Sequence, residues 1–212
     1  MQTANPPCPI TDRQLDELAQ LGYAIIDNYL PVALIQALRQ QATRLWEAGI
    51  MHQASVGKAD SNKITSEIRG DSIYWLDEES LSAEQLDYLA TMQSLQEALN
   101  RHFFLGLFEF ECHFAVYAPG AIYQKHLDQF KGQQERQISA VLYLNENWQQ
   151  DNGGELRLYL EEGKNPDFID IAPLGGRLVL FLSGRFYHEV LPMRRTRISL
   201  TGWFRTRSLE LR

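Results

Sequence analysis

The residue pattern with the clearest chemical meaning is His126-Leu127-Asp128, followed by His188 and then by Arg197. In an extended segment, residues two apart point to the same side, so His126 and Asp128 can reach one ion. His188 follows a predicted strand and turn and can supply the third ligand. Two imidazoles and a carboxylate suit iron(II), manganese or zinc, and a metal with one open face favours oxygenase chemistry.

Arg197 begins the last predicted strand, whose two faces differ in chemistry. One face can donate hydrogen bonds throughout and the opposite face is apolar; the donor face carries Arg197, Ser199, Thr201 and Trp203. A guanidinium matches a carboxylate in fork geometry. Tyr143 lies on the polar side of the strand predicted over 138–144 and offers a second donor. We therefore expect Arg197 and Tyr143 to hold a carboxylate of a co-substrate.

Two other interpretations of these residues stay open at this point. A His-x-Asp pair also occurs by chance, because surface His and Asp are common. Glu109, Glu111 and His113 alternate along one strand and are a competing set of metal ligands. Ligands on a single strand splay along the sheet, however, and this set has no partner that would grip a carboxylate.

The composition indicates a globular protein with one sizeable domain. The chain has 212 residues and a net charge of −7, which argues against a surface that follows nucleic-acid phosphates and fits a basic or neutral protein partner better. The two cysteines, Cys8 and Cys112, form neither a disulfide framework nor a Cys-rich zinc site. With no signal pattern and no apolar run of membrane-spanning length, the expected location is cytoplasmic, away from membranes.

Helical periodicity dominates the first half of the chain and strand alternation the second. Helices are expected from Thr11–Asp12 to Gly22, from Pro31 to about Ala48, and over 82–104; strands are expected over 23–27, 72–76, 108–117, 138–144, 178–182 and 197–204. This order predicts an α+β protein, a β-sandwich or barrel with helices packed on one side. We expect a flexible arm over 1–10, then a single domain over 11–212.

Residues 52–71 carry few large apolar side chains and are expected to form a long loop. Long loops in compact domains are often lids or binding segments, although a plain disordered insertion has the same composition. We expect a mobile segment near 52–67.

Taken together, the motifs resemble the iron(II)- and 2-oxoglutarate-dependent oxygenases. Within them the chain is most similar to the prolyl 4-hydroxylase branch, which includes the hypoxia-inducible-factor prolyl hydroxylases and bacterial relatives. Besides the triad and Arg197, the matching segments are Ile68-Arg69-Gly70-Asp71 with Ile73 and Trp75-Leu76, Tyr117-Ala118-Pro119-Gly120, Val141-Leu142-Tyr143-Leu144-Asn145 with Trp148, Gly153-Gly154-Glu155-Leu156, His188-Glu189-Val190 with Pro192, and Thr201 to Phe204.

This resemblance implies a double-stranded β-helix (jelly-roll) core with N-terminal supporting helices. It assigns Fe(II) to His126, Asp128 and His188, which are then both the metal ligands and the catalytic centre. It places the distal carboxylate of 2-oxoglutarate on Arg197 and Tyr143. Further residues are assigned by their matching positions: Tyr117, Thr201 and Trp203 to the co-substrate and iron pocket, and Arg136, Arg69, Asp71 and Trp75 to the substrate side.

The resemblance implies hydroxylation of a prolyl residue in a protein substrate, with O₂ consumed, succinate and CO₂ formed, and ascorbate as an accessory reductant. Bacterial members of the branch make a translation elongation factor a candidate partner. The alternatives are a hydroxylase of a free amino acid or metabolite and a non-catalytic metal-binding jelly-roll sensor. No nucleic-acid partner is expected.

Overall fold

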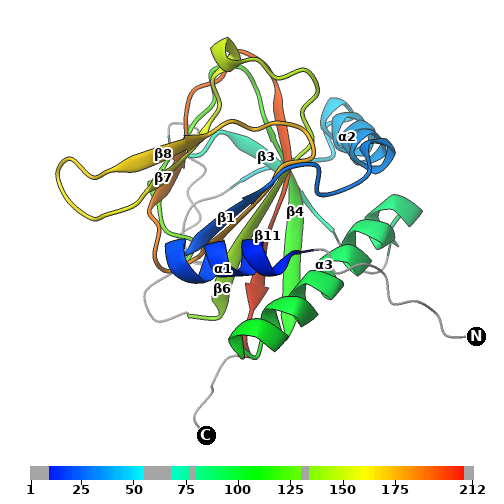
Figure 1. Cartoon of the computed structure of the whole chain (residues 1–212). Coiled ribbons are helices and arrows are strands. Elements are labelled where there is room, and N and C mark those ends of the chain that lie inside the picture. The colour runs from blue at the N-terminus through cyan, green and yellow to red at the C-terminus, as the bar shows by residue number, and fades with distance from the viewer. Residues whose placement is uncertain (1–9, 55–67, 77–79, 130–133, 208–212) are drawn as a thin grey trace, which may run out of the picture.

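The computed structural model describes residues 10–54, 68–76, 80–129 and 134–207. Its strands form two antiparallel sheets (Figure 1). The larger sheet has seven strands in the order β1-β9-β6-β11-β4-β3-β2, and the smaller has four in the order β5-β10-β7-β8. The strands are β1 Tyr23–Ile26, β2 His52–Gln53, β3 Asp71–Trp75, β4 Glu109–Tyr117, β5 Tyr123–His126, β6 Arg136–Tyr143, β7 Leu156–Tyr159, β8 Phe168–Ile171, β9 Leu178–Leu182, β10 His188–Val190 and β11 Arg197–Arg205.

The central strands of both sheets pair with strands from distant parts of the chain. β11 is central in the larger sheet, where it pairs with β4 on one side and β6 on the other. β10 likewise pairs with β5 and β7 in the smaller sheet. The predicted α+β class and double-stranded β-helix core are confirmed.

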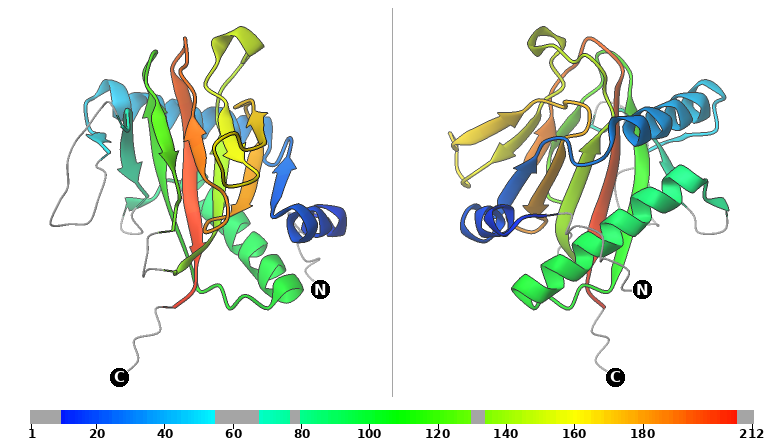
Figure 2. Two further views of the ribbon diagram at one scale, coloured as in Figure 1. Left: turned by 90° about the vertical axis from the view of Figure 1, so that its left-hand side faces the viewer. Right: turned by 45° about the vertical axis from the view of Figure 1, so that its right-hand side comes forward.

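Three helices cover one face of the larger sheet, as Figure 2 shows. They are α1 Asp12–Leu21, α2 Val32–Glu47 and α3 Ala83–Phe103; a short 3-10 helix, η3, spans Gln150–Asn152. Local capping sets the ends of α1: the Thr11 side chain accepts from the backbone of Gln14, and Gly22 closes the helix in the left-handed region. Ser82 begins α3 with the same type of capping box.

The packing gives β11 two different environments. Ile198, Leu200 and Phe204 are buried in the hydrophobic core between the larger sheet and the helices. Arg197, Thr201 and Trp203 point to the opposite face and line a pocket between the two sheets. The two-faced pattern of the last strand therefore reflects a strand between an apolar layer and a polar cavity.

The predicted mobile segment and the predicted N-terminal arm are each corrected in part, and the remainder of each lies outside the described residues. His52 and Gln53 do not belong to a loop, because they form β2 and pair with Ile73 and Ser72. Ala54 is also ordered by its neighbours, since it is buried and its backbone nitrogen donates to the carbonyl oxygen of Asp71. The rest of the predicted mobile segment, 55–67, is outside the described residues. So is the predicted arm up to residue 9, while Ile10 is buried in the core rather than free. No helix in the described part of the chain is long and apolar enough to cross a bilayer.

Candidate active site

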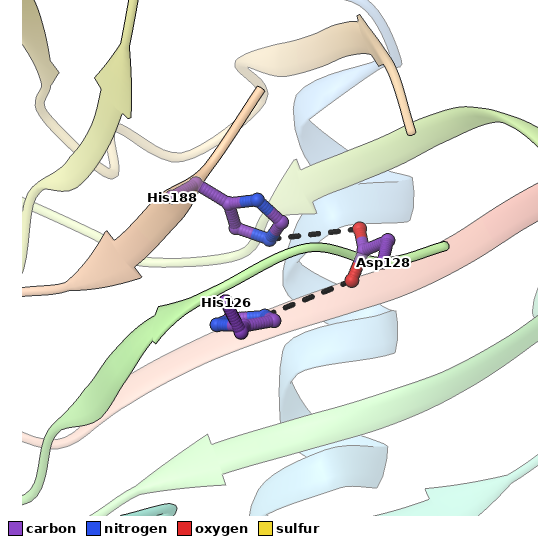
Figure 3. A group of neighbouring side chains, drawn as sticks. All are labelled: His126, Asp128 and His188. Carbon is purple, nitrogen blue, oxygen red and sulfur yellow. Dashed lines mark ion pairs between the residues drawn. The ribbon is translucent and has the colours of Figure 1, made fainter. Parts of the chain in front are cut away.

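His126, Asp128 and His188 converge at one end of the smaller sheet (Figure 3). His126 ends β5 and lies opposite His188, the first residue of β10. Asp128 follows β5 by two residues, so its carboxylate reaches both rings. Its Oδ1 lies 3.7 Å from His126 Nε2, and its Oδ2 lies 3.5 Å from His188 Nε2. The three candidate ligand atoms are all within 4.8 Å of one another.

Backbone carbonyl groups fix which nitrogen of each imidazole faces the centre of the triad. His126 Nδ1 lies 2.8 Å from the carbonyl oxygen of Gln124, and His188 Nδ1 lies 3.0 Å from that of Phe186. A carbonyl only accepts, so both Nδ1 atoms carry the hydrogen. In each neutral ring the lone pair is then on Nε2, directed toward Asp128, which is the arrangement that metal-binding histidines use.

Electrostatics keep Asp128 ionised in this buried position. Burial alone would raise its pKa, but the nearby imidazoles and the Ser139 hydroxyl outweigh burial and hold the pKa well below its usual range. Burial lowers the pKa of His126 to about 3. Burial also acts to lower the pKa of His188, but the Asp128 carboxylate reverses this and raises it. The triad thus offers one negative oxygen and two nitrogen donors.

This donor set fits a divalent transition metal such as iron(II). Within the described residues, these three side chains are the one His, Cys, Asp and Glu group close enough together to hold an ion. The competing set does not assemble. Glu111 is instead bound to Arg136 at 2.8 Å and to Arg205 at 2.9 Å, and Glu109 also faces Arg205.

One pocket of about 460 Å³ brings the predicted site residues together. Among its lining residues are the triad, Arg197, Tyr117, Thr201, Trp203, Arg136, Arg69, Asp71 and Trp75. Tyr143 is absent from the lining but lies directly beside Arg197, with the guanidinium carbon 4.9 Å from its ring centroid. The roles assigned to these residues remain predictions.

The inner end of the pocket has the chemistry of a carboxylate anchor. Arg197 is only 2% exposed, and its Nε donates to the carbonyl oxygen of Gly154 at 3.0 Å. The buried hydroxyl of Tyr143 lies beside the guanidinium without a hydrogen bond of proper geometry to any described residue. A buried polar group without a partner is costly, so a carboxylate that accepts from both side chains would complete this end.

Gly154 lets the chain pass close enough to Arg197 to accept its hydrogen bond. Its φ of 73° lies in the left-handed region, and a Cβ there would meet Met193, Trp148 and the Cδ of Arg197 at 3.1 to 3.4 Å. A larger residue would therefore strain the backbone and press on the arginine. This explains why a glycine stands at this turn.

Aromatic rings form the outer wall of the pocket. The His113 ring lies 4.7 Å from that of Trp75 and 5.5 Å from that of Trp203, and Arg136 stacks over Trp203 at 3.6 Å. Burial lowers the pKa of His113 to about 3, so this ring is neutral. His113 Nδ1 and Trp203 Nε1 are buried, and neither has a hydrogen-bond partner among the described residues.

Arg69 and Asp71, predicted on the substrate side, bind each other. The guanidinium makes two hydrogen bonds to the carboxylate, at 2.7 and 3.0 Å, and Asp71 is 1% exposed. Arg69 also lies over the Tyr123 ring, which stacks on His126 with centroids 3.6 Å apart. In this structure the pair therefore supports the candidate ligand His126 through the Tyr123 ring.

Sequence reasoning missed three residues of the site. Tyr123 matched no ligand pattern, although a tyrosine three residues before a metal-binding histidine is a natural packing partner for it. His113 was considered only as a ligand, and its place in the pocket wall follows from its pairing opposite Thr201. Ser139 donates to Asp128 at 2.6 Å, and a single serine in an otherwise apolar strand was the signal for it.

Comparison of the whole chain with known proteins identifies one family. The model of the 2OG-Fe(II) oxygenase superfamily matches residues 112–205. The curated "Hypoxia-inducible factor prolyl hydroxylase" of Caenorhabditis elegans is 31% identical over 209 residues, which are 94% of this chain and 28% of the relative. Human "Egl nine homolog 1" is also 31% identical, with 86% of this chain and 43% of the relative covered. The chain thus spans less than half the length of these relatives.

Two solved structures cover nearly all of the chain. A Pseudomonas putida prolyl-4-hydroxylase has 44% sequence identity and a TM-score of 0.82, over 92% of this chain and 98% of that one. A Trichoplax adhaerens prolyl hydroxylase, solved in complex with a hypoxia-inducible-factor oxygen degradation domain peptide fragment, has 30% identity and a TM-score of 0.79. The match covers 91% of this chain and 87% of the Trichoplax chain.

Proposed function

The chain belongs to the 2OG-Fe(II) oxygenase superfamily, and we propose that it is a dioxygenase that hydroxylates a prolyl residue of a protein substrate. The observation that carries the proposal is the shared pocket of the His126-Asp128-His188 triad and Arg197. A metal-ligand face and a buried cation at the inner end of the same cavity match a metal with a dicarboxylate co-substrate.

His126 Nε2, His188 Nε2 and the Asp128 carboxylate would hold Fe(II). When bound, the iron supplies the coupling of 2-oxoglutarate decarboxylation, with O₂ as oxidant, to insertion of one oxygen atom into a substrate C–H bond. The protein contributes ligands whose lone pairs already face one point. The two backbone hydrogen bonds to Nδ1 keep the rings in that orientation.

Arg197 and Tyr143 would take the distal carboxylate of 2-oxoglutarate. The guanidinium supplies a fixed positive charge at a position that is only 2% exposed, where a charge-assisted hydrogen bond is strong. Thr201 and Tyr117 line the same pocket as this anchor and the triad. Their side chains would bound the co-substrate and exclude water from it. Ascorbate, as a reductant in solution, would keep the iron in its ferrous state.

The outer wall supports a peptide as substrate. Trp75 is 45% exposed at the pocket, and aromatic walls suit proline-containing segments, whose rings pack on aromatic faces. The Arg136 guanidinium and the Trp203 indole can both donate hydrogen bonds, which suits the carbonyl groups of a prolyl peptide because its imide nitrogen carries no hydrogen. A translation elongation factor is our candidate for the substrate protein.

The test is to incubate the iron-loaded protein with 2-oxoglutarate and cell lysate in air, and to identify by mass spectrometry any protein that gains one oxygen on proline. A modified elongation factor would support the finer proposal, and another modified protein would support only the coarser one. Consumption of 2-oxoglutarate without a modified protein would favour a small-molecule substrate. Absence of succinate under all conditions would favour a metal-binding sensor.

A further inference from the structure

A buried pair of serines connects the metal carboxylate to the larger sheet. Ser139 Oγ lies 2.6 Å from Asp128 Oδ2, and Ser183 Oγ lies 2.9 Å from Ser139 Oγ. Both serines are 0% exposed. Ser139 lies in β6, and Ser183 directly follows β9, the strand that pairs with β6. Asp128 itself follows β5 of the smaller sheet, so this chain of hydrogen bonds joins the two sheets at the metal site.

The chemistry of the three groups fixes the direction of both hydrogen bonds. An ionised carboxylate only accepts, so Ser139 must donate its one hydroxyl hydrogen to Asp128. Ser139 then has no hydrogen left for Ser183, and Ser183 must be the donor in the second bond. Each oxygen of the chain is thus satisfied in a single arrangement, which ends on Asp128 Oδ2.

The backbone around the pair is also held in place. The backbone nitrogen of Ser183 donates to the carbonyl oxygen of Gln137 at 3.0 Å. Gln129, the neighbour of Asp128, donates through Nε2 to the carbonyl oxygen of Arg136 at 2.8 Å. These contacts keep the segment that carries Asp128 against the end of β6, so the two hydroxyl groups meet the carboxylate at a defined place.

We propose that Ser139 is a positioning residue for the metal ligand, which holds Oδ2 of Asp128 and leaves Oδ1 to bind the ion, with Ser183 fixing the orientation of its hydroxyl. The inference rests on the iron site of the proposed function. It has a consequence for the open face of the metal, because a carboxylate that binds through both oxygens occupies one more coordination position. Ser139 would keep that position available for co-substrate or O₂.

The experiment measures Mn(II) binding to the metal-free protein from the electron paramagnetic resonance signal of free Mn(II), with no substrate present. Ser139→Ala should weaken Mn(II) binding about 10-fold, the lower end of what loss of a partner of a metal ligand costs. Ser139→Thr retains the hydroxyl and should restore affinity to near that of the natural protein. Ser183→Ala leaves the Ser139 hydroxyl present but free to rotate, and should weaken binding by a smaller factor, about 3-fold.

The matched control is Ser199→Ala, which removes an equally buried hydroxyl on β11 that makes no contact with Asp128. Its Mn(II) affinity should be unchanged. Natural affinity in Ser139→Ala would overturn the proposal, and natural affinity in Ser183→Ala would overturn the role of Ser183. Thermal melting of each metal-free variant shows whether it folds. Should Ser139→Ala not fold, weaker Mn(II) binding in Ser183→Ala would support the proposal, and natural affinity in Ser183→Ala would then overturn it as a whole. Because no substrate is used, failure to find a hydroxylated protein would not alter these outcomes.

Discussion

His126 on β5 and His188 on β10 are paired directly opposite one another in the smaller sheet, with ring centroids 4.2 Å apart. Main-chain pairing between the two strands therefore sets the separation of the two rings. Tyr123 stacks on the first ring, and Phe181 packs edge-on against the second at 4.8 Å. Both candidate ligands are thus oriented by packing as well as by their backbone hydrogen bonds, as expected of a preorganised metal site.

Replacement of His126 by alanine should abolish iron retention and succinate formation together. The change removes one of three ligands, so it should weaken iron affinity by more than the roughly 10- to 100-fold that loss of a supporting residue costs. Iron content after gel filtration and succinate release measure the two effects. His102→Ala, on α3 and outside the pocket lining, is the control and should leave both unchanged. Natural iron affinity in His126→Ala would show that the ion binds elsewhere.

Replacement of Arg197 by alanine should raise the 2-oxoglutarate requirement and leave iron binding intact. Truncating one partner of a buried, hydrogen-bonded charge pair costs about 2–5 kcal/mol, so the apparent affinity for 2-oxoglutarate should fall roughly 30-fold or more. Arg197→Lys keeps the positive charge but loses the paired N–H donors of the guanidinium. Its apparent affinity for 2-oxoglutarate should lie between that of the natural protein and that of Arg197→Ala.

The measurements for Arg197 are 2-oxoglutarate titrations of succinate formation and Mn(II) binding to each variant. Arg194→Ala removes a nearby exposed arginine and serves as the control. An unchanged 2-oxoglutarate dependence in Arg197→Ala would show that Arg197 does not bind the co-substrate carboxylate. Loss of metal binding in the same variant would instead indicate a general collapse of the pocket.

Local signals made the helices predictable from the sequence to within about a residue. Thr11 with Gln14 and Gly22 close α1 through their own backbone and side-chain contacts, so no distant residue is needed to place its ends. The alternation of β11 likewise revealed its polar and apolar faces, because the two sides of a strand differ at every second residue.

The smaller sheet was not predictable in the same way. β10 has three residues, and its partners β5 and β7 are far away in the sequence. Such pairing depends on long-range register rather than on local composition. The contact of Ser139 with Asp128 likewise emerged only in the folded chain, because it joins β6 of the larger sheet to the segment that follows β5 of the smaller one. The triad could be proposed as metal ligands from its residue types, whereas the residues that pack on it could not.

Replacement of Trp75 by alanine should weaken peptide hydroxylation more than it affects 2-oxoglutarate turnover without peptide. Trp75 is half-exposed at the outer wall and packs against His113. It pairs with His113 on β4, whereas Arg197 pairs with Tyr117, four residues further along the same strand. A large aromatic at the centre of a binding surface contributes about 2 kcal/mol or more, so the KM for a peptide substrate should rise roughly 30-fold. Phe104→Ala, which removes an aromatic side chain that is 89% exposed and outside the pocket lining, is the control. Equal losses in coupled and uncoupled turnover would argue against a substrate-binding role.

Cys112, buried on β4, should make the stability of the fold depend on pH in the alkaline range. Burial raises the pKa of its thiol to about 12, against about 8.5 in an unfolded chain. Unfolding therefore releases a proton above pH 8.5, and the stability that this thiol contributes is complete below that pH and lost as the pH rises toward 12. In a Cys8→Ser background, the free energy of unfolding should fall between pH 7 and 10 by about 2 kcal/mol more than in Cys8→Ser/Cys112→Ala. Guanidinium titrations at the two pH values measure the difference, and equal losses in the two proteins would contradict the raised pKa.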